Sequence, residues 1–235
     1  MAPRKADRLI EGLEAHLRFL KEAGVEDVFK IPPPPAKPVP GPRPGSDAEF
    51  GLAALREEIR VCRKCGLADG RTQAVPGEGL SSTPLMFVGE GPGRDEDLQG
   101  RPFVGKAGQL LTKIIAAMTF ERKDVYIANI VKCRPPDNRV PLRAEVETCT
   151  PYLLRQIALI KPKVIVTLGK TATEFFLPNA TGSMTSIRGQ FYDWNGLRVM
   201  PTFHPSYLDR NPADKVIRKM VWDDMQQVMS FLGRQ

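Results

Sequence analysis

The sequence predicts a three-layer α/β/α fold built on a central, mostly parallel, four-stranded sheet. Apolar runs at residues 85–89, 125–131 and 164–169 indicate buried strands, and segments with helical patterning separate them. Strands that alternate with helices of about ten or more residues form a mostly parallel sheet that helices cover on both faces. The fourth strand is expected as the second arm of a hairpin over residues 190–200, which continues to residue 203.

The helices are expected in the intervals that this fold requires. Residues 48–61 form a helix that leads into Cys62, and residues 66–84 are expected to be irregular. Later helices are expected at 106–119, 142–160, 170–177 and 211–232. Asn195-Gly196 is the turn of the predicted hairpin, because this pair readily adopts the left-handed backbone of a two-residue turn.

The first 45 residues differ in composition from the rest. Leucines at helical spacing predict an amphipathic helix within residues 1–30, and residues 31–45 form a proline-rich spacer of the polyproline II type. The main domain is expected to cover residues 46–235. The tethered helix can dock on this domain or on a protein partner, and a poorly ordered tail fits the pattern equally well.

Charge and hydropathy narrow the kind of protein. The net charge is +7 over 235 residues, and residues 1–49 carry equal numbers of basic and acidic side chains, so the excess lies on the main domain. A basic folded domain suggests a polyanionic partner such as nucleic acid. The sequence shows neither an apolar run of membrane-spanning length nor a signal peptide, so we expect a cytoplasmic location.

Polar groups follow each of the predicted strands. They are Glu90-Gly91, Asn129, Gly169-Lys170 and His204. Sheets of this kind bind ligands beyond the carboxyl ends of their strands, so these groups are expected to converge on one site. The glycines of the turn at 89–93 allow a ligand to approach the backbone closely.

The four cysteines suggest a metal site. Cys62 and Cys65 form a C-x-x-C pair, and Cys133 and Cys149 lie far along the chain. In a reducing compartment such a set favours a metal over two disulfides. Spacing alone leaves zinc, an iron–sulfur cluster and four unrelated buried thiols as alternatives.

Taken together, these motifs resemble the family-4 uracil-DNA glycosylases, the iron–sulfur branch of their superfamily. The resemblance covers residues 50–232 and rests on Gly89-Glu-Gly-Pro-Gly with Glu96-Asp97, Gly100-Arg-Pro-Phe-Val-Gly, Asn129 before Cys133, Val164-Ile-Val-Thr-Leu-Gly and His204-Pro-Ser-Tyr-Leu. It implies a monofunctional enzyme that flips uracil out of single- or double-stranded DNA and hydrolyses its glycosidic bond, leaving an abasic site. We expect a monomer. The resemblance also implies that the four cysteines hold a structural [4Fe-4S] cluster rather than zinc.

The resemblance implies a role for each site residue. The uracil-binding set is Glu90, Gly91, Pro92, Phe103, Asn129 and His204. The Asn129 amide can accept from uracil N3–H and donate to O4, a pattern that cytosine reverses. Phe103 would stack on the base. His204, the third catalytic candidate beside two glutamates, would stabilise negative charge on uracil O2, with the Gly91 N–H as a further donor.

Two points of catalysis stay open at this stage. Glu90 is the first candidate for orienting the attacking water and Glu96 the second, because Gly91 stands where better-known relatives have an aspartate. Gly93 replaces the tyrosine by which those relatives exclude thymine, so the group that excludes thymine here is not identified.

Five residues are the expected DNA contacts. They are Lys106, Lys170, Ser206, Leu208 and Arg210. Leu208 is the expected apolar wedge that pushes the base out. The family commonly reads His-Pro-Ser-x-Leu-Leu-Arg, and here Asp209 takes the second leucine position, so duplex binding should be weaker and single-stranded DNA less affected.

Two rival functions remain at the sequence level. One is a branch of the superfamily in which a histidine traps the sugar covalently, but its basic insertion has no counterpart between Gly93 and Gly105. The other is a non-catalytic uracil- or DNA-binding module, against which the intact Glu90, Asn129 and His204 argue.

Overall fold

A computed structural model describes residues 46–234 of the chain. The predicted N-terminal helix within 1–30 and the linker at 31–45 lie outside these residues. The described residues begin with helix α2 (Ser46–Arg60), which ends two residues before Cys62 as expected. Within the described part of the chain, no helix has the length and apolar character needed to cross a membrane.

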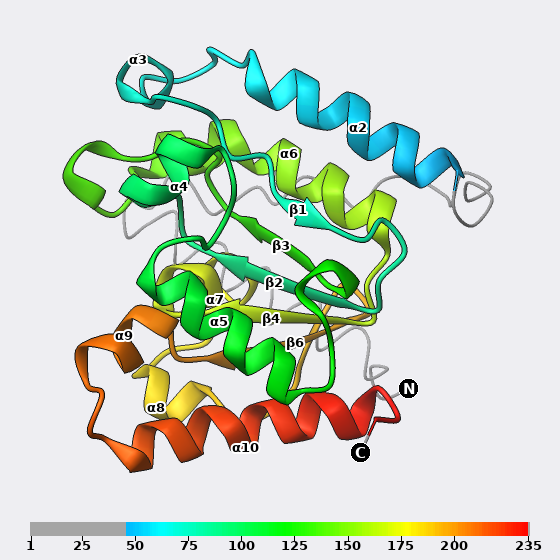
Figure 1. Ribbon diagram of the computed structural model, residues 1–235, viewed down its shortest axis with the longest axis vertical. Coiled ribbons are helices and arrows are strands. Elements are labelled where there is room, and N and C mark those ends of the chain that lie inside the picture. The colour runs from blue at the N-terminus through cyan, green and yellow to red at the C-terminus, as the bar shows by residue number, and fades with distance from the viewer. Residues whose placement is uncertain (1–45, 235) are drawn as a thin grey trace, which may run out of the picture. The chain divides into compact units, whose positions relative to one another are not determined.

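The sheet has six strands in the order β1-β3-β2-β4-β6-β5 (Figure 1). The strands are β1 (Glu78–Gly79), β2 (Leu85–Gly89), β3 (Tyr126–Asn129), β4 (Val164–Leu168), β5 (Tyr192–Trp194) and β6 (Leu197–Thr202). The four inner strands are parallel, which confirms the predicted sheet. The predicted number of four strands was too low, because β1 and β5 each add one antiparallel strand at a side of the sheet. Strand β1 lies in the segment expected to be irregular, and β5 is the first arm of the predicted hairpin.

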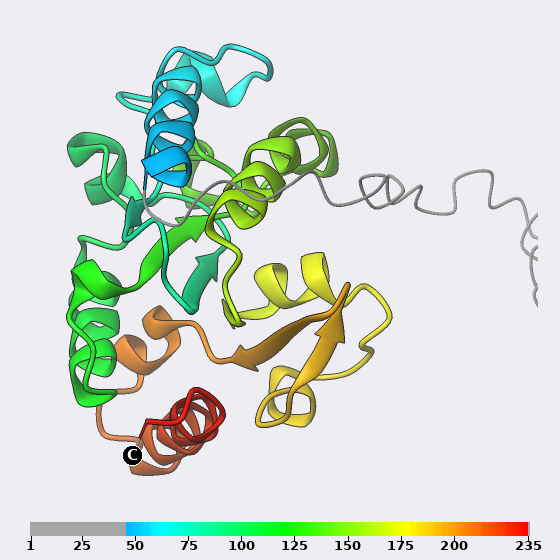
Figure 2. The same ribbon diagram turned by 90° about the vertical axis from the view of Figure 1, so that its right-hand side faces the viewer.

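Helices cover both faces of the sheet, as predicted (Figures 1 and 2). Helices α2 and α6 (Arg143–Ile160) share one apolar cluster with the sheet, and α5 (Lys106–Ala117) and α10 (Lys215–Phe231) share another. Strand β2 shows why both form: Met86 and Val88 point into the first cluster, and the alternate residues Leu85 and Phe87 point into the second. A strand buried on both faces reads as the continuous apolar run seen in the sequence.

Short helices fill the connections at the sheet edges. They are α3 (Leu67–Gly70), α4 (Arg94–Gln99), α7 (Lys170–Phe176), α8 (Met184–Ile187), α9 (Pro205–Arg210) and the 3-10 turns η1 (Arg122–Asp124) and η2 (Pro136–Asn138). Of these, only α7 was expected. Helices α4 and α9 follow the ends of β2 and β6, so they shape the edge at which the parallel strands end.

The strand register brings the predicted polar groups to that edge. Gly89 pairs with Asn129 across β2 and β3, and Leu168 pairs with Thr202 across β4 and β6. Glu90 and Gly169 are the next residues along their strands, and His204 follows two residues after Thr202. Four segments that are distant in the sequence therefore end side by side.

Candidate active site and cysteine cavity

Gly89 is the point at which two side chains of the site meet. A Cβ atom on Gly89 would lie 2.5 Å from Cζ of Phe103 and 2.6 Å from Oδ1 of Asn129. Phe103 comes from the loop after α4, and Asn129 ends β3. Because Gly89 has no side chain, the ring of Phe103 and the amide of Asn129 can approach each other in the space that a Cβ atom would fill.

The backbone of Phe103 is strained. Its φ angle is +50°, a left-handed conformation that costs an L-residue with a large side chain about 1–2 kcal/mol. The residue is only 6% exposed, and its carbonyl packs on Gly108 of α5 so closely that a side chain there would collide with it. Arg122 donates a hydrogen bond to the carbonyl of the preceding residue, Pro102. The ring is therefore held in place by its surroundings.

Glu96 holds the same loop. Its Oε1 accepts from the N–H groups of Val104 (2.7 Å) and Gly105 (2.9 Å), and its Oε2 accepts from the N–H of Gly93 (3.1 Å). A carboxylate has about four acceptor positions, so these three bonds leave one. Glu96 therefore connects the glycine-rich turn before α4 to the segment that carries Phe103.

Glu90 is less occupied than Glu96. Its Oε2 accepts a hydrogen bond from Thr171 Oγ1 at 2.5 Å, the single hydrogen bond of this carboxylate within residues 46–234. The side chain is half-buried at the end of β2. Of the two candidate carboxylates, Glu90 is the one with acceptor capacity left for a water molecule.

Asn129 presents an unpaired acceptor. The residue is 1% exposed, and its Oδ1 atom has no hydrogen-bond partner among the described residues. A buried polar atom left unpaired costs about 1–3 kcal/mol. An atom in this state beside an aromatic ring is suited to accept a hydrogen bond from a planar ligand that carries an N–H group.

His204 is a neutral hydrogen-bond donor. Desolvation, aided by the positive charge of Arg210 and opposed by Glu96, lowers the pKa of His204 to about 4. Its Nδ1 accepts from the N–H of Ser206 at 3.1 Å, so the proton of the neutral ring resides on Nε2. The ring centroid lies 5.7 Å from that of Phe103. The site thus holds an aromatic face, a buried acceptor and a neutral imidazole donor.

The expected DNA contacts divide into exposed and buried groups. Lys106, Lys170 and Arg210 are exposed, although Lys170 also lies 3.5 Å from Glu174. Ser206 is half-buried, and its Oγ lies 2.8 Å from His204 Nδ1.

Leu208, the expected apolar wedge, does not face solvent in this structure. It is 3% exposed, because α9 turns it into an apolar cluster with Phe203 and Val221. The exposed apolar residue of this helix is Tyr207, which is 39% exposed and whose ring lies 5.2 Å from that of Phe203. Asp209 is also exposed.

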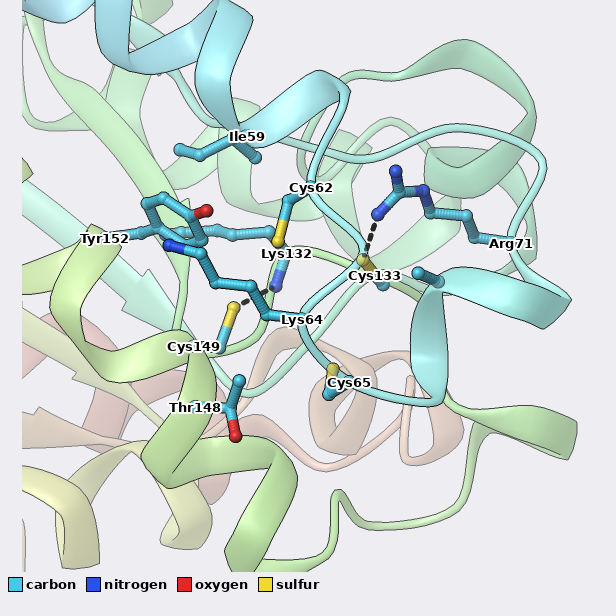
Figure 3. A pocket seen from close by; sticks show the side chains of 11 residues that line it. Ile59, Cys62, Lys64, Cys65, Arg71, Lys132, Cys133, Thr148, Cys149 and Tyr152 are labelled. Atoms are coloured by element: carbon cyan, nitrogen blue, oxygen red, sulfur yellow. Dashed lines mark hydrogen bonds between the residues drawn. The ribbon is translucent and has the colours of Figure 1, made fainter.

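The four cysteines line one cavity (Figure 3). Cys62 and Cys65 follow α2, Cys133 follows β3, and Cys149 lies on α6. Cys133 Sγ accepts from Arg71 Nη1 at 2.9 Å, and Cys149 Sγ accepts from the N–H of Lys132 at 3.3 Å. Four sulfur atoms from three segments, with N–H donors directed at two of them, form a donor set typical of a bound metal group.

Two further properties of the cysteine cavity are its metal geometry and the acidity of Cys149. Among residues 46–234, no three Cys, His, Asp or Glu side chains lie where they could hold a single metal ion. A zinc ion would require sulfur atoms at about 2.3 Å from one centre. Burial raises the pKa of Cys149 to about 11, against the effect of Lys132, so this thiol is no free nucleophile.

Two residues of the site had not been expected. Thr171 holds Glu90, and Lys132 lies between Asn129 and the cysteines. Lys132 is 1% exposed, and burial lowers its pKa to about 8, opposed by the neighbouring cysteines. Its position next to Cys133 could have indicated that Lys132 lies near the cysteine site. Because lysines are almost always exposed, the sequence did not predict its burial.

Comparison with known proteins agrees with this geometry. A family model described as the uracil DNA glycosylase superfamily matches residues 76–226. A type-4 uracil-DNA glycosylase of Thermotoga maritima is 48% identical over 185 residues, which cover 78% of this chain and 96% of that protein. One from Saccharolobus solfataricus is 45% identical over 190 residues, covering 77% and 87%. A type-5 uracil-DNA glycosylase of Pyrobaculum aerophilum is 30% identical over 176 residues, covering 68% and 77%.

Proposed function

The chain belongs to the uracil-DNA glycosylase superfamily, and on that premise we propose that it is a monofunctional type-4 uracil-DNA glycosylase. It flips uracil out of DNA, hydrolyses the bond between the base and deoxyribose, and leaves an abasic site for base excision repair. The observation that carries the proposal is the buried, unpaired Oδ1 of Asn129 beside the ring of Phe103.

Asn129 reads the base. Its Oδ1 accepts from uracil N3–H and its amide NH₂ donates to O4, while Phe103 stacks on the ring. Cytosine presents the opposite pattern at both positions, and each buried mismatch costs about 1–3 kcal/mol. Gly91 and Pro92 complete the pocket, and a side chain at Gly91 would come within 2.8 Å of Val131 Cγ2.

His204 and Glu90 support bond cleavage. As the C1′–N1 bond breaks, its electron pair leaves with uracil and negative charge develops on O2, to which His204 Nε2–H donates a hydrogen bond. A water oxygen bonds to C1′ and loses its proton. Glu90 orients that water, accepts its proton and stabilises the cationic sugar. Glu96 is instead assigned to holding the loop, because three backbone N–H groups already use its oxygens.

The cysteine cavity is assigned to a [4Fe-4S] cluster held by Cys62, Cys65, Cys133 and Cys149. Support comes from the shared cavity and from the N–H donors directed at the sulfur atoms of Cys133 and Cys149. The cluster supplies cross-links between segments rather than redox chemistry. Loss of visible absorbance on Cys133→Ala, together with lower stability, is the expected result, and a colourless but fully stable and active variant would exclude this assignment.

DNA binds along the edge where the parallel strands end. Lys106, Lys170, Ser206 and Arg210 contact phosphates, and Tyr207 rather than Leu208 supports the bases around the flipped nucleotide. The exposed Asp209 repels phosphate, so single-stranded DNA is bound with less penalty than duplex.

Two further parts of the proposal concern the whole chain. The protein acts as a monomer in the cytoplasm, where its DNA substrate lies. The segment 1–45, outside the described residues, is assigned to a protein partner through its predicted helix.

The test is excision from a labelled oligonucleotide that contains one uracil, single-stranded or paired with guanine or adenine. Strand cleavage that appears only after hot alkali would establish a glycosylase, and the same oligonucleotide with thymine is the control. A shifted band without alkali would indicate the covalent branch. DNA binding with neither product would indicate a binding module.

Matched variants separate the two carboxylates. Glu90→Gln should lower the single-turnover rate while the melting temperature stays unchanged. Glu96→Gln should lower the melting temperature, because its amide NH₂ group replaces one of the two oxygens that accept the N–H groups of Gly93, Val104 and Gly105. The reverse pattern would transfer the water-orienting role to Glu96.

A further inference from the structure

We propose that Lys132 is a positioning residue that couples the cysteine cavity to the base-reading amide of Asn129. The inference deepens the proposed function, since it assumes that Asn129 reads uracil. It starts from a buried lysine that the reaction itself does not use.

The contacts of Lys132 join the two sites directly. Its Nζ donates to the backbone carbonyl of Asn129 at 2.6 Å and to Gln156 Oε1 at 2.7 Å. Its backbone N–H donates to Cys149 Sγ at 3.3 Å, and the next residue is Cys133. One residue therefore binds the carbonyl of the base reader with its side chain and a cysteine sulfur with its backbone.

The anchor on the far side of the ammonium is rigid. Gln156 lies on α6, is fully buried, and donates to Tyr126 Oη at 3.0 Å and to the carbonyl of Pro76 at 2.5 Å. Because Gln156 is held from two directions, it fixes where Lys132 Nζ lies. Lysines are almost never fully buried without partners, and the two short hydrogen bonds of Lys132 offset the cost of burying its ammonium group.

The bond to Asn129 acts where the sheet ends. After Asn129 the chain still pairs with β2, since Ile130 N–H donates to Gly89 O at 2.9 Å and Val131 N–H donates to Glu90 O at 3.1 Å. The carbonyl of Asn129 is bound by Lys132 across a turn of three residues. Rotation of this peptide would swing the unpaired Oδ1 away from the base, and a misplacement of about 1 Å at a reacting site can cost about 100-fold in rate.

The test is a double-mutant cycle between Lys132→Met and Asn129→Ala. Methionine keeps an unbranched side chain but cannot donate a hydrogen bond. Lys132→Met should lower the single-turnover rate on uracil about 10- to 100-fold, and about threefold or less once Asn129 is alanine. Binding of DNA with a non-hydrolysable 2′-fluorodeoxyuridine should weaken, while binding of DNA with an abasic analogue should change by less than about threefold.

Controls distinguish positioning from a structural defect. Lys163→Met removes the same charge from an exposed lysine just before β4, at the opposite edge of the sheet, and should leave rate and binding unchanged. Visible absorbance and melting temperature report on the cysteine site and the fold. If Lys132→Met does not fold, Gln156→Met carries the same cycle, because it removes the anchor and leaves the Lys132–Asn129 bond.

Different results would contradict the coupling of Lys132 to Asn129 and the proposed excision of uracil. Equal rate losses with and without the Asn129 side chain, or equal losses for uracil and abasic DNA, would overturn the coupling. Loss of the visible absorbance with unchanged single-turnover rates would also overturn it. A wild-type protein that does not excise uracil would instead refute the proposed function.

Discussion

His204 should remain neutral until the pH falls to about 4, whereas an ordinary histidine becomes charged near 6.5. Desolvation of the ring is the main cause, and the charge of Arg210 adds to it. The hydrogen bond from the Ser206 N–H to Nδ1 also favours the neutral ring, because that nitrogen cannot accept the bond once it is protonated. Excision should therefore not depend on His204 protonation between pH 8 and about 5.

The sign of the effect on stability follows from the same shift. Between pH 6.5 and about 4 the unfolded chain binds a proton at this histidine and the folded chain does not, so stability falls as the pH falls through this window. One pH unit corresponds to about 1.4 kcal/mol, and the window therefore to about 3 kcal/mol. Above pH 6.5 both states are neutral, and His204 contributes no pH dependence.

The chain is well suited to the measurement. It has two histidines, His16 and His204, so a titration of imidazole NMR signals needs only one variant for assignment. Urea unfolding from pH 7 to pH 4.5 gives the stability, and His204→Asn is the matched variant, because asparagine also accepts hydrogen bonds at a helix N-terminus. The difference in unfolding free energy between the two proteins should shrink or reverse as the pH falls. A His204 signal that titrates at or above pH 6.5, or excision that requires its protonation, would refute the neutral-donor mechanism.

Four other changes test separate parts of the structure. Asn129→Asp should shift excision toward cytosine, measured on matched oligonucleotides; unchanged uracil preference would remove its reading role. Asp224→Ala leaves the half-buried Arg188 without its fully buried ion-pair partner and should lower the unfolding free energy in urea by about 3–5 kcal/mol. Asp137 has a φ of +52°, so Asp137→Gly should not destabilise and should raise the unfolding free energy in urea by up to about 1 kcal/mol. Tyr207→Ala should slow excision from duplex more than from single strands, and equal effects would contradict the assigned contact.

The sheet and the place of the site followed from the sequence, because both depend on local patterns. Strands buried on two faces appear as short apolar runs, and parallel strands must end at one edge. The short elements could not be found this way. Helices α4 and α9 have six residues each, too few to show a helical period, and β1 has two.

The surroundings of a side chain could not be predicted where residues distant in the sequence decide them. Tyr207 and Leu208 are adjacent, and the side chain of either could be buried. Leu208 is the buried one because it packs against Phe203 and Val221. Lys132 reads as a surface residue until Gln156, 24 positions away, is placed beside it. The three bonds that occupy Glu96 likewise come from a loop whose course the sequence does not reveal.

Three unfavourable features lie at the carboxyl edge of the sheet: the strained backbone of Phe103, the unpaired Oδ1 of Asn129 and the desolvated ring of His204. The first two lower the stability of the folded chain at any pH, and the third lowers it below pH 6.5, so each must be held by something outside itself. Different groups do this: Glu96 holds the loop of Phe103, Lys132 the carbonyl of Asn129, and Ser206 the ring of His204. A site whose donor, acceptor and aromatic face are fixed before the base arrives needs little reorganisation during bond cleavage, which is the condition under which electrostatic stabilisation is most effective.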